Sequence, residues 1–147
     1  MKLINIKKEE IFPAVILFIS FFSIIFSSIA GSTLKESIFL THYNKSALPL
    51  MYVFTALFMT FFVIFYRKLS ILKDQISVML IFNSIFFIFF IFFTFDLTTY
   101  KIPIFYVIFE IFMGISVMQF WVIAGEVFNS RQAKRIFTII ISGGSVA

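Results

Sequence analysis

Long runs of apolar residues alternate with short polar segments along the 147-residue chain. A hydrocarbon core about 30 Å thick needs roughly 20 helical residues, because each residue rises about 1.5 Å. Lipid offers no water to unpaired backbone groups, which favours helices over strands in such runs. Four predicted spans cover residues 11–34, 47–66, 75–95 and 102–125, and a fifth, partial helix is predicted over 130–147.

Residues typical of helix starts mark the ends of these runs. Pro49 and Pro103 stand at the openings of the second and fourth spans, where a missing N–H group leaves no hydrogen bond unmade. Asp74 is expected to cap the third span, and Asn129 followed by Gln132 is typical of a capping box. The pattern therefore predicts an all-α, polytopic transmembrane helical bundle in a single transmembrane domain, with four full spans plus a truncated fifth.

Composition excludes a water-soluble fold. Hydrophobic residues make up 61% of the chain and charged residues 13%, with 25 Phe, whereas about a quarter of the residues in a soluble domain are charged. The net charge of +5 does not indicate nucleic-acid binding, because the basic residues are scattered between apolar runs instead of sharing one face. We therefore expect the lipid bilayer, and no nucleic acid, as a partner.

Few residues suited to catalysis or metal binding are present. The chain has no Cys and a single histidine, His42, which excludes disulfides and thiolate ligands and leaves too few ligands for a histidine-based metal site. No Gly-rich phosphate loop follows a strand, and no carboxylates are paired at catalytic spacing. We therefore expect neither an enzyme nor a metal or cofactor.

Lysine and arginine residues are distributed unequally between the two sides of the predicted bundle. Nine of the twelve fall on one side: Lys2, Lys7, Lys8, Arg67, Lys68, Lys73, Arg131, Lys134 and Arg135. The other side has Lys35, Lys45 and Lys101. Because cytoplasmic loops are enriched in Lys and Arg, we expect a multi-pass protein of the cell (inner) membrane with a cytoplasmic N-terminus.

Two further features concern the ends of the chain. Ser28 and Ala30 are placed as in a signal-peptide cleavage site, but the preceding apolar run is longer than usual, which favours a retained first helix. The segment after Arg135 is too short to span a membrane. Its small residues suit close helix packing, but no partner for them is evident in the chain. We therefore expect either the front part of a longer protein or a truncated one.

A polar stripe runs along the first span. Ser20, Ser23, Ser27, Gly31 and Lys35 fall within about 120° of one another on a helical wheel. One interpretation is helix packing, with the lysine snorkelling to the membrane interface. The other is a pathway for solute or water that leads to Lys35.

Glu110 lies about 10 Å into the fourth span, counted from Pro103. An ionisable group at that depth is a functional-site hypothesis by default. Lys35 and Glu110 fall in the same half of the membrane and could pair, either in a solute site or in a purely structural bridge; alternatively Glu110 is protonated in lipid. The candidate substrate-binding residues are Lys35, Glu110, Ser27, Gly31 and Trp121.

The polar stretch before the fifth helix is a second candidate site. Arg131, Lys134 and Arg135 have i, i+3 and i+4 spacing and share one side of a helix. They either contact lipid headgroups and orient the chain, or form a cytoplasmic gate by pairing with Glu126 or Asp74.

Several short motifs carry a resemblance to a known family. These are Lys35–Glu36 after the first span, Leu48-Pro49-x-x-Tyr52, Phe120–Trp121, and Ala133-Lys134-Arg135 before a Gly-containing helix. With these motifs the chain resembles the N-terminal part of the bacterial and plastid ATP/ADP translocase (nucleotide transporter) family and of related transporters of the major facilitator type.

The resemblance implies twelve helices in two six-helix halves, of which this chain would supply the first four and part of the fifth in a major-facilitator-like N-terminal half. Helices one and four would line the central cavity, and Lys35 would meet the phosphates of a nucleotide. We therefore expect the N-terminal portion of a secondary transporter for nucleotides or another anionic solute, with the missing C-terminal part as partner. The alternatives are a small non-transporting membrane accessory protein or a truncated, inactive remnant.

Overall fold

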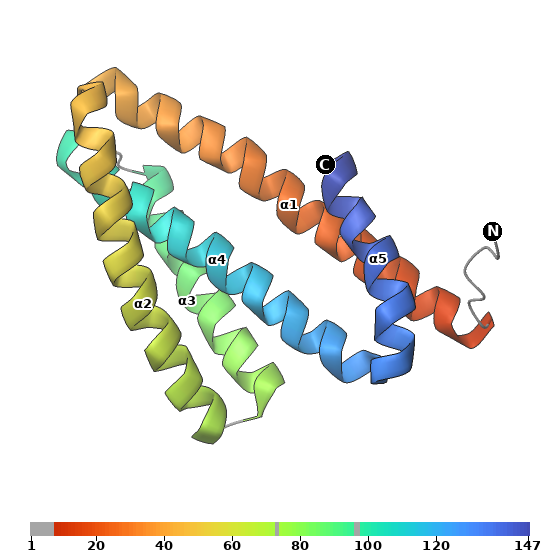
Figure 1. Ribbon diagram of the computed structural model, residues 1–147. Coiled ribbons are helices and arrows are strands. Elements are labelled where there is room, and N and C mark those ends of the chain that lie inside the picture. The colour runs from red at the N-terminus through yellow and green to blue at the C-terminus, as the bar shows by residue number, and fades with distance from the viewer. Residues whose placement is uncertain (1–7, 73, 96–97) are drawn as a thin grey trace. The chain divides into compact units, whose positions relative to one another are not determined.

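The chain folds almost entirely into helices in the computed structural model, which describes residues 8–72, 74–95 and 98–147 (Figure 1). The elements are α1 (Lys8–His42), a 3-10 turn at Lys45–Ala47, α2 (Leu48–Leu72), α3 (Gln75–Phe95), a 3-10 turn at Thr99–Lys101, α4 (Ile102–Val127) and α5 (Ser130–Val146). Four of these helices are long and apolar enough to cross a membrane. The all-α prediction is confirmed, and the chain is a membrane-embedded protein.

The predicted helix starts are also confirmed. The backbone N–H of Ser77 donates to Asp74 Oδ2 at 3.0 Å, so Asp74 caps α3. Asn129 and Gln132 form the capping box of α5, in which the Asn129 N–H donates to Gln132 Oε1 at 3.0 Å. Each bond satisfies a backbone donor that a helix start leaves free.

Two helices continue more than one turn beyond their predicted spans. The first span was expected to end at residue 34, but α1 continues to His42 and is 35 residues long. That corresponds to about 52 Å, well over the thickness of a hydrocarbon core. The second helix continues past residue 66 to Leu72, with Arg67 and Lys68 exposed. Charged residues end an apolar run without ending a helix, because Lys and Arg are good helix formers.

The described residues fall into two compact units. The first unit comprises residues 8–30 and 116–147, and the second comprises residues 31–115. The first unit has a buried apolar core formed by Ala14, Leu17, Phe21, Phe120, Ala124, Phe128, Ile136 and Ile140. Residues from α1, α4 and α5 contribute to this core.

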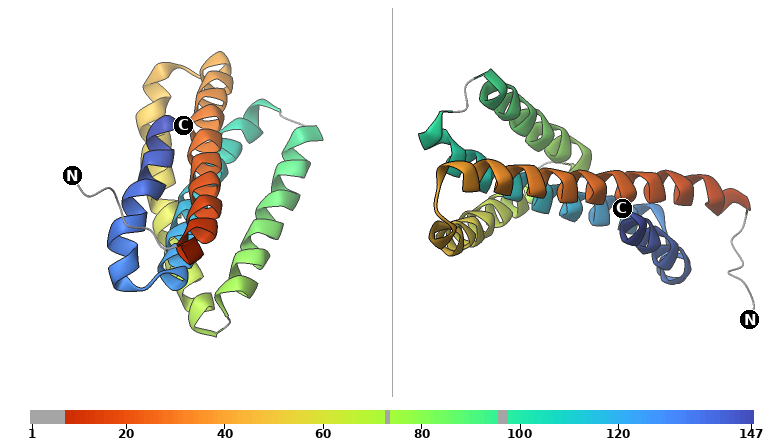
Figure 2. Two further views of the ribbon diagram at one scale, coloured as in Figure 1. Left: turned by 90° about the vertical axis from the view of Figure 1, so that its right-hand side faces the viewer. Right: turned by 90° about the horizontal axis from the view of Figure 1, so that it is seen from above.

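Within the first unit, α5 packs against the N-terminal part of α1 (Figure 2). A Cβ atom added to Gly143 would lie 3.0 Å from Phe18 Cε2, and one added to Gly144 would lie 2.7 Å from Phe21 Cε1. The expectation that the small residues of this helix have no partner in the chain is therefore wrong. Their partner is distant in sequence, and small side chains let the two helices approach closely.

Aromatic contacts hold together the helices of the second unit. One face of α3 is buried and includes Val78, Phe82, Phe86 and Phe93. The ring centroid of Phe86 lies 5.1 Å from that of Phe112 on α4, within the range of favourable aromatic pairs. Other faces of α3 and α2 expose large apolar side chains, as expected of helices whose solvent is lipid.

Candidate functional site

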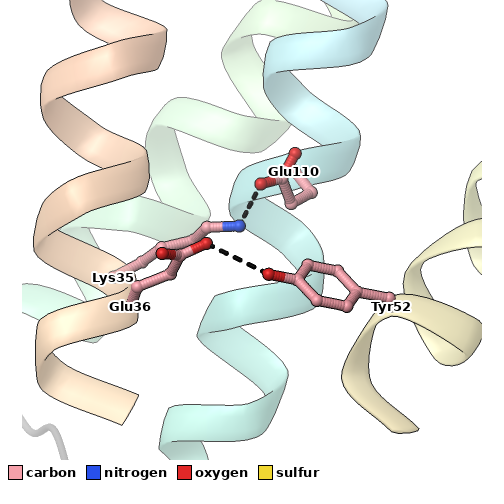
Figure 3. Close-up of polar contacts among 4 residues, drawn as sticks. All are labelled: Lys35, Glu36, Tyr52 and Glu110. Carbon is pink, nitrogen blue, oxygen red and sulfur yellow. Dashed lines mark hydrogen bonds and ion pairs between the residues drawn. The ribbon is translucent and has the colours of Figure 1, made fainter. Parts of the chain in front are cut away.

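A buried ion pair joins α1 to α4 inside the second unit. Lys35 is 1% exposed, and its Nζ atom donates to Glu110 Oε1 (Figure 3). The pairing expected from the sequence is present, whereas the snorkelling interpretation is wrong because the lysine side chain has no exposed surface. Helix α1 continues beyond Lys35 to His42, so Lys35 does not lie at a helix end. Its ammonium group is paired with a carboxylate on α4 instead of being solvated by water.

Close approach of the two helices makes this pairing possible. Gly31, Lys35 and Phe39 recur at four-residue intervals and therefore share one face of α1. A Cβ atom on Gly31 would collide with the Phe109 ring on α4, so only a glycine fits there without displacing that ring. The Phe39 ring lies 5.3 Å from that of Tyr106, one turn further along. The glycine thus allows the approach, and the phenylalanine packs against the tyrosine of the facing helix.

Tyr106 is the third member of the site. Lys35 Nζ lies 3.8 Å from the centroid of its ring, so the ammonium group contacts both a carboxylate and an aromatic face. The Tyr106 side chain is fully buried. Its hydroxyl makes no well-formed hydrogen bond to the described residues, although the Tyr52 hydroxyl lies nearby. Sequence reasoning missed Tyr106, but its position four residues before Glu110 places it on the same face of α4.

A second acid lies beside the ion pair. The Tyr52 hydroxyl on α2 donates to Glu36 Oε1 at 3.4 Å, a long hydrogen bond (Figure 3). Three helices thus converge on a cluster with one ammonium group and two carboxylates. The Glu110 side chain is 35% exposed while that of Lys35 is fully buried, so the accessible charge of the ion pair is the acid.

The other two predicted substrate-binding residues lie in the first unit. Ser27 is exposed on α1. The Trp121 ring packs among Phe21, Phe120 and Phe137, at centroid distances of 5.4, 5.3 and 5.3 Å. Aromatic packing therefore accounts for Trp121, and the structure groups only Lys35, Gly31 and Glu110 of the predicted set.

The predicted cytoplasmic gate stays a prediction. Glu126 is exposed at the end of α4, and the side chains of Arg131, Lys134 and Arg135 lie outside the described residues. Asp74, the alternative partner, uses its carboxylate to cap α3.

A different contact is present at the start of α5. Gln132 Nε2 donates to Glu10 Oε1 at 2.7 Å, and Glu10 is 6% exposed. The two residues are separated by 122 positions, so no pattern in the sequence indicates this pair. The bond ties the first turn of α5 to the beginning of α1.

A wholly apolar groove of about 500 Å³ also lies in the second unit. Its lining includes Phe39, Met51, Phe54, Phe58, Val107 and Ile111. Such a surface suits a lipid chain or another helix and offers no group to bind a charged solute. Among the described residues no group of three or more His, Cys, Asp or Glu side chains could hold a metal ion.

Comparison of the chain with protein-family models, with curated proteins and with solved structures gives no match. Any functional proposal therefore rests on the sequence and the site of this chain.

Proposed function

We propose that the chain is the N-terminal portion of a secondary membrane transporter and that Lys35 binds an anionic solute. The observation that carries the proposal is the ion pair between a fully buried lysine and a partly accessible glutamate on two membrane-spanning helices. The resemblance of several short motifs to those of nucleotide transporters makes a nucleotide the first solute to test.

Energetics favour a functional role for the pair. Removing two charges from water costs several kcal/mol per ion, and well-packed apolar side chains often stabilise a protein as well as a buried ion pair does. Ionisable residues inside membrane helices are correspondingly rare, and they commonly mark pathways for solutes, ions or protons. A helix contact alone would not require Lys35 and Glu110 in a chain otherwise rich in Phe and Ile.

The exposed part of Glu110 indicates where a solute would enter. An ionised carboxylate faces a water-filled cavity or another protein surface, because contact with lipid tails is costly. We infer that the open side of Glu110 faces the cavity of the assembled transporter. Alternating access requires a second bundle that moves against this one, so the chain alone is expected to bind solute without transporting it.

Solute binding can be measured on the full chain in lipid nanodiscs with radiolabelled ATP as the probe. Lys35→Ala is expected to lower the affinity at least about tenfold, which corresponds to the loss of about 1.4 kcal/mol. Lys45→Ala is the matched control, because Lys45 is an exposed lysine in the same unit, and it is expected to bind like the wild type. Equal affinities for the Lys35→Ala and Lys45→Ala variants would remove Lys35 from the site.

A further inference from the structure

We propose that the apolar groove of the second unit binds one acyl chain of an anionic phospholipid, and that Lys45 contacts the phosphate of its headgroup. This lipid site is separate from the ion pair, because neither Lys35 nor Glu110 lines the groove. It does not depend on the proposed function.

The groove is long and narrow. On α2 its lining runs from Ala47 to Phe62, and on α4 it runs from Pro103 to Ile111. At about 1.5 Å per helical residue these stretches are about 22 and 12 Å long, less than the roughly 30 Å of a hydrocarbon core. The groove therefore follows the two helices from the turns that precede them into the membrane, without crossing it.

The width of the groove favours a hydrocarbon chain over a helix. A volume of about 500 Å³, divided by a length of about 12 to 22 Å, gives a mean cross-section of about 20–40 Å². An α-helix with its side chains is about 10 Å across, which corresponds to a cross-section of about 80 Å². A helix would enter this groove only in part, whereas an extended acyl chain lies along it.

A basic segment lies at the mouth of the groove. Tyr43 and Ala47 both line the groove, and Lys45 stands between them in the turn that precedes α2. The Tyr43 hydroxyl donates to the Thr99 carbonyl oxygen at 2.9 Å, which joins this turn to the turn that carries Lys101. Lys45 is exposed and forms no ion pair with a described residue.

The charges at this end of the groove favour an anionic headgroup. The Lys45 ammonium group is carried on a flexible stem, which lets it reach a phosphate at the mouth of the groove. Lys101 adds a second positive charge at the same end. The acids closest in the chain to these lysines are Glu36, which binds Tyr52 and does not line the groove, and Asp96, which lies outside the described residues.

The headgroup provides the selectivity of the site. Lipid tails are as apolar as the groove, so moving a chain from the bilayer into the groove gains no hydrophobic free energy. A lysine near the membrane surface favours an anionic lipid over a neutral one by a factor of about five, which corresponds to about 1 kcal/mol. The groove therefore positions the chain, and Lys45 determines which lipid is held.

The lipids retained by the full chain test the proposal. The chain is reconstituted in vesicles that contain equal amounts of phosphatidylglycerol and phosphatidylcholine, purified in a mild detergent, and analysed by mass spectrometry. We expect phosphatidylglycerol to be enriched about fivefold over phosphatidylcholine. Lys45→Glu should abolish the enrichment, whereas Lys68→Glu, the same change at an exposed lysine near the other end of α2, should keep it.

A second pair of variants tests the place of the acyl chain. Ala47→Trp puts a bulky side chain into the groove and is expected to abolish the retention of phosphatidylglycerol. Ala56→Trp is the matched control, because Ala56 is an exposed residue of α2 that does not line the groove. Unchanged retention in Ala47→Trp would show that the chain binds elsewhere.

A measurement on the wild type keeps the test decisive if Ala47→Trp does not fold. Lysophosphatidylglycerol, which has a single acyl chain, is expected to displace the retained lipid, and glycerol phosphate, which has none, is not. Equal retention of the two lipids by the wild type, equal losses in Lys45→Glu and Lys68→Glu, or recovery of a lipid-free dimer in which a second copy covers the groove would overturn the proposal. ATP is absent throughout, so none of these results bears on the proposed function.

Discussion

At the residue scale, the two members of the ion pair differ in exposure, and therefore in how well the charge of each is solvated when its partner is removed. Lys35 has no route to water, because its side chain is fully buried between α1 and α4. About a third of the Glu110 side chain is exposed, so its carboxylate can be solvated from that side. The two single substitutions should therefore have unequal effects on stability.

We expect Glu110→Leu to destabilise the chain by about 3–5 kcal/mol, since it leaves a buried ammonium ion without its carboxylate. Lys35→Met should cost less, because the remaining Glu110 carboxylate is partly exposed and keeps part of its solvation. Thermal unfolding followed by circular dichroism in one detergent would compare them. The double variant should recover part of the loss, and equal losses for the two single variants would contradict this asymmetry.

At the element scale, glycine contacts set how closely helices pack in both units. Gly31 lies against the Phe109 ring between α1 and α4, and Gly143 lies against Phe18 between α5 and α1. In membranes such contacts replace the hydrophobic effect as a source of helix association, because lipid tails are as apolar as the side chains.

Gly31→Leu should push α1 away from α4 and thereby separate Lys35 from Glu110. Overpacking of this kind costs about 1–3 kcal/mol, and we expect a lower unfolding temperature together with weaker ATP binding. Gly125→Leu is the matched control, because nothing lies within 4 Å of a Cβ atom at that position. Similar losses in both variants would show that glycine is needed for another reason.

Gly143→Leu should displace α5 from α1 in the first unit. The single tryptophan, Trp121, reports this change because its ring packs 5.3 Å from Phe137 on α5. We expect the fluorescence emission to shift to longer wavelength as that contact opens. Ser142→Leu places the same side chain at an exposed position of α5 and should leave the spectrum unchanged.

At the scale of the whole molecule, the lysine and arginine distribution predicts which ends of the helices face the cytoplasm. Lys35 does not belong to that count, since it is buried inside a helix instead of lying in a loop. Lys45 and Lys101 remain on the side expected to be external, while Arg67 and Lys68 are exposed near the other end of α2. Removing Lys35 from the count strengthens the asymmetry.

Cysteine labelling tests this orientation without background, because the chain contains no Cys. A membrane-impermeant maleimide applied to intact cells should label Ser46→Cys and leave Lys68→Cys unlabelled until the membrane is opened. The reverse pattern would place the N-terminus outside and overturn the predicted orientation.

Features that depend on neighbouring residues could be predicted from the sequence. Span positions follow from the number of apolar residues needed to cross a bilayer, and the cap at Asp74 and the capping box at Asn129 follow from short-range hydrogen bonding. The pairing of Lys35 with Glu110 could also be anticipated, because two opposite charges in the same half of a membrane have few other partners.

Tertiary structure alone decided the surroundings of that pair. Tyr106 beneath the ammonium group, the close contact of Gly31 with the Phe109 ring, and the bond from Gln132 to Glu10 all join residues far apart in the chain. Helical periodicity assigns a residue to a face of its own helix, but it does not say which face of which helix lies opposite. The sequence therefore determined that Lys35 follows the first predicted span and that Glu110 lies within the fourth, and the packing of α1 against α4 determined that the lysine side chain is buried against the glutamate.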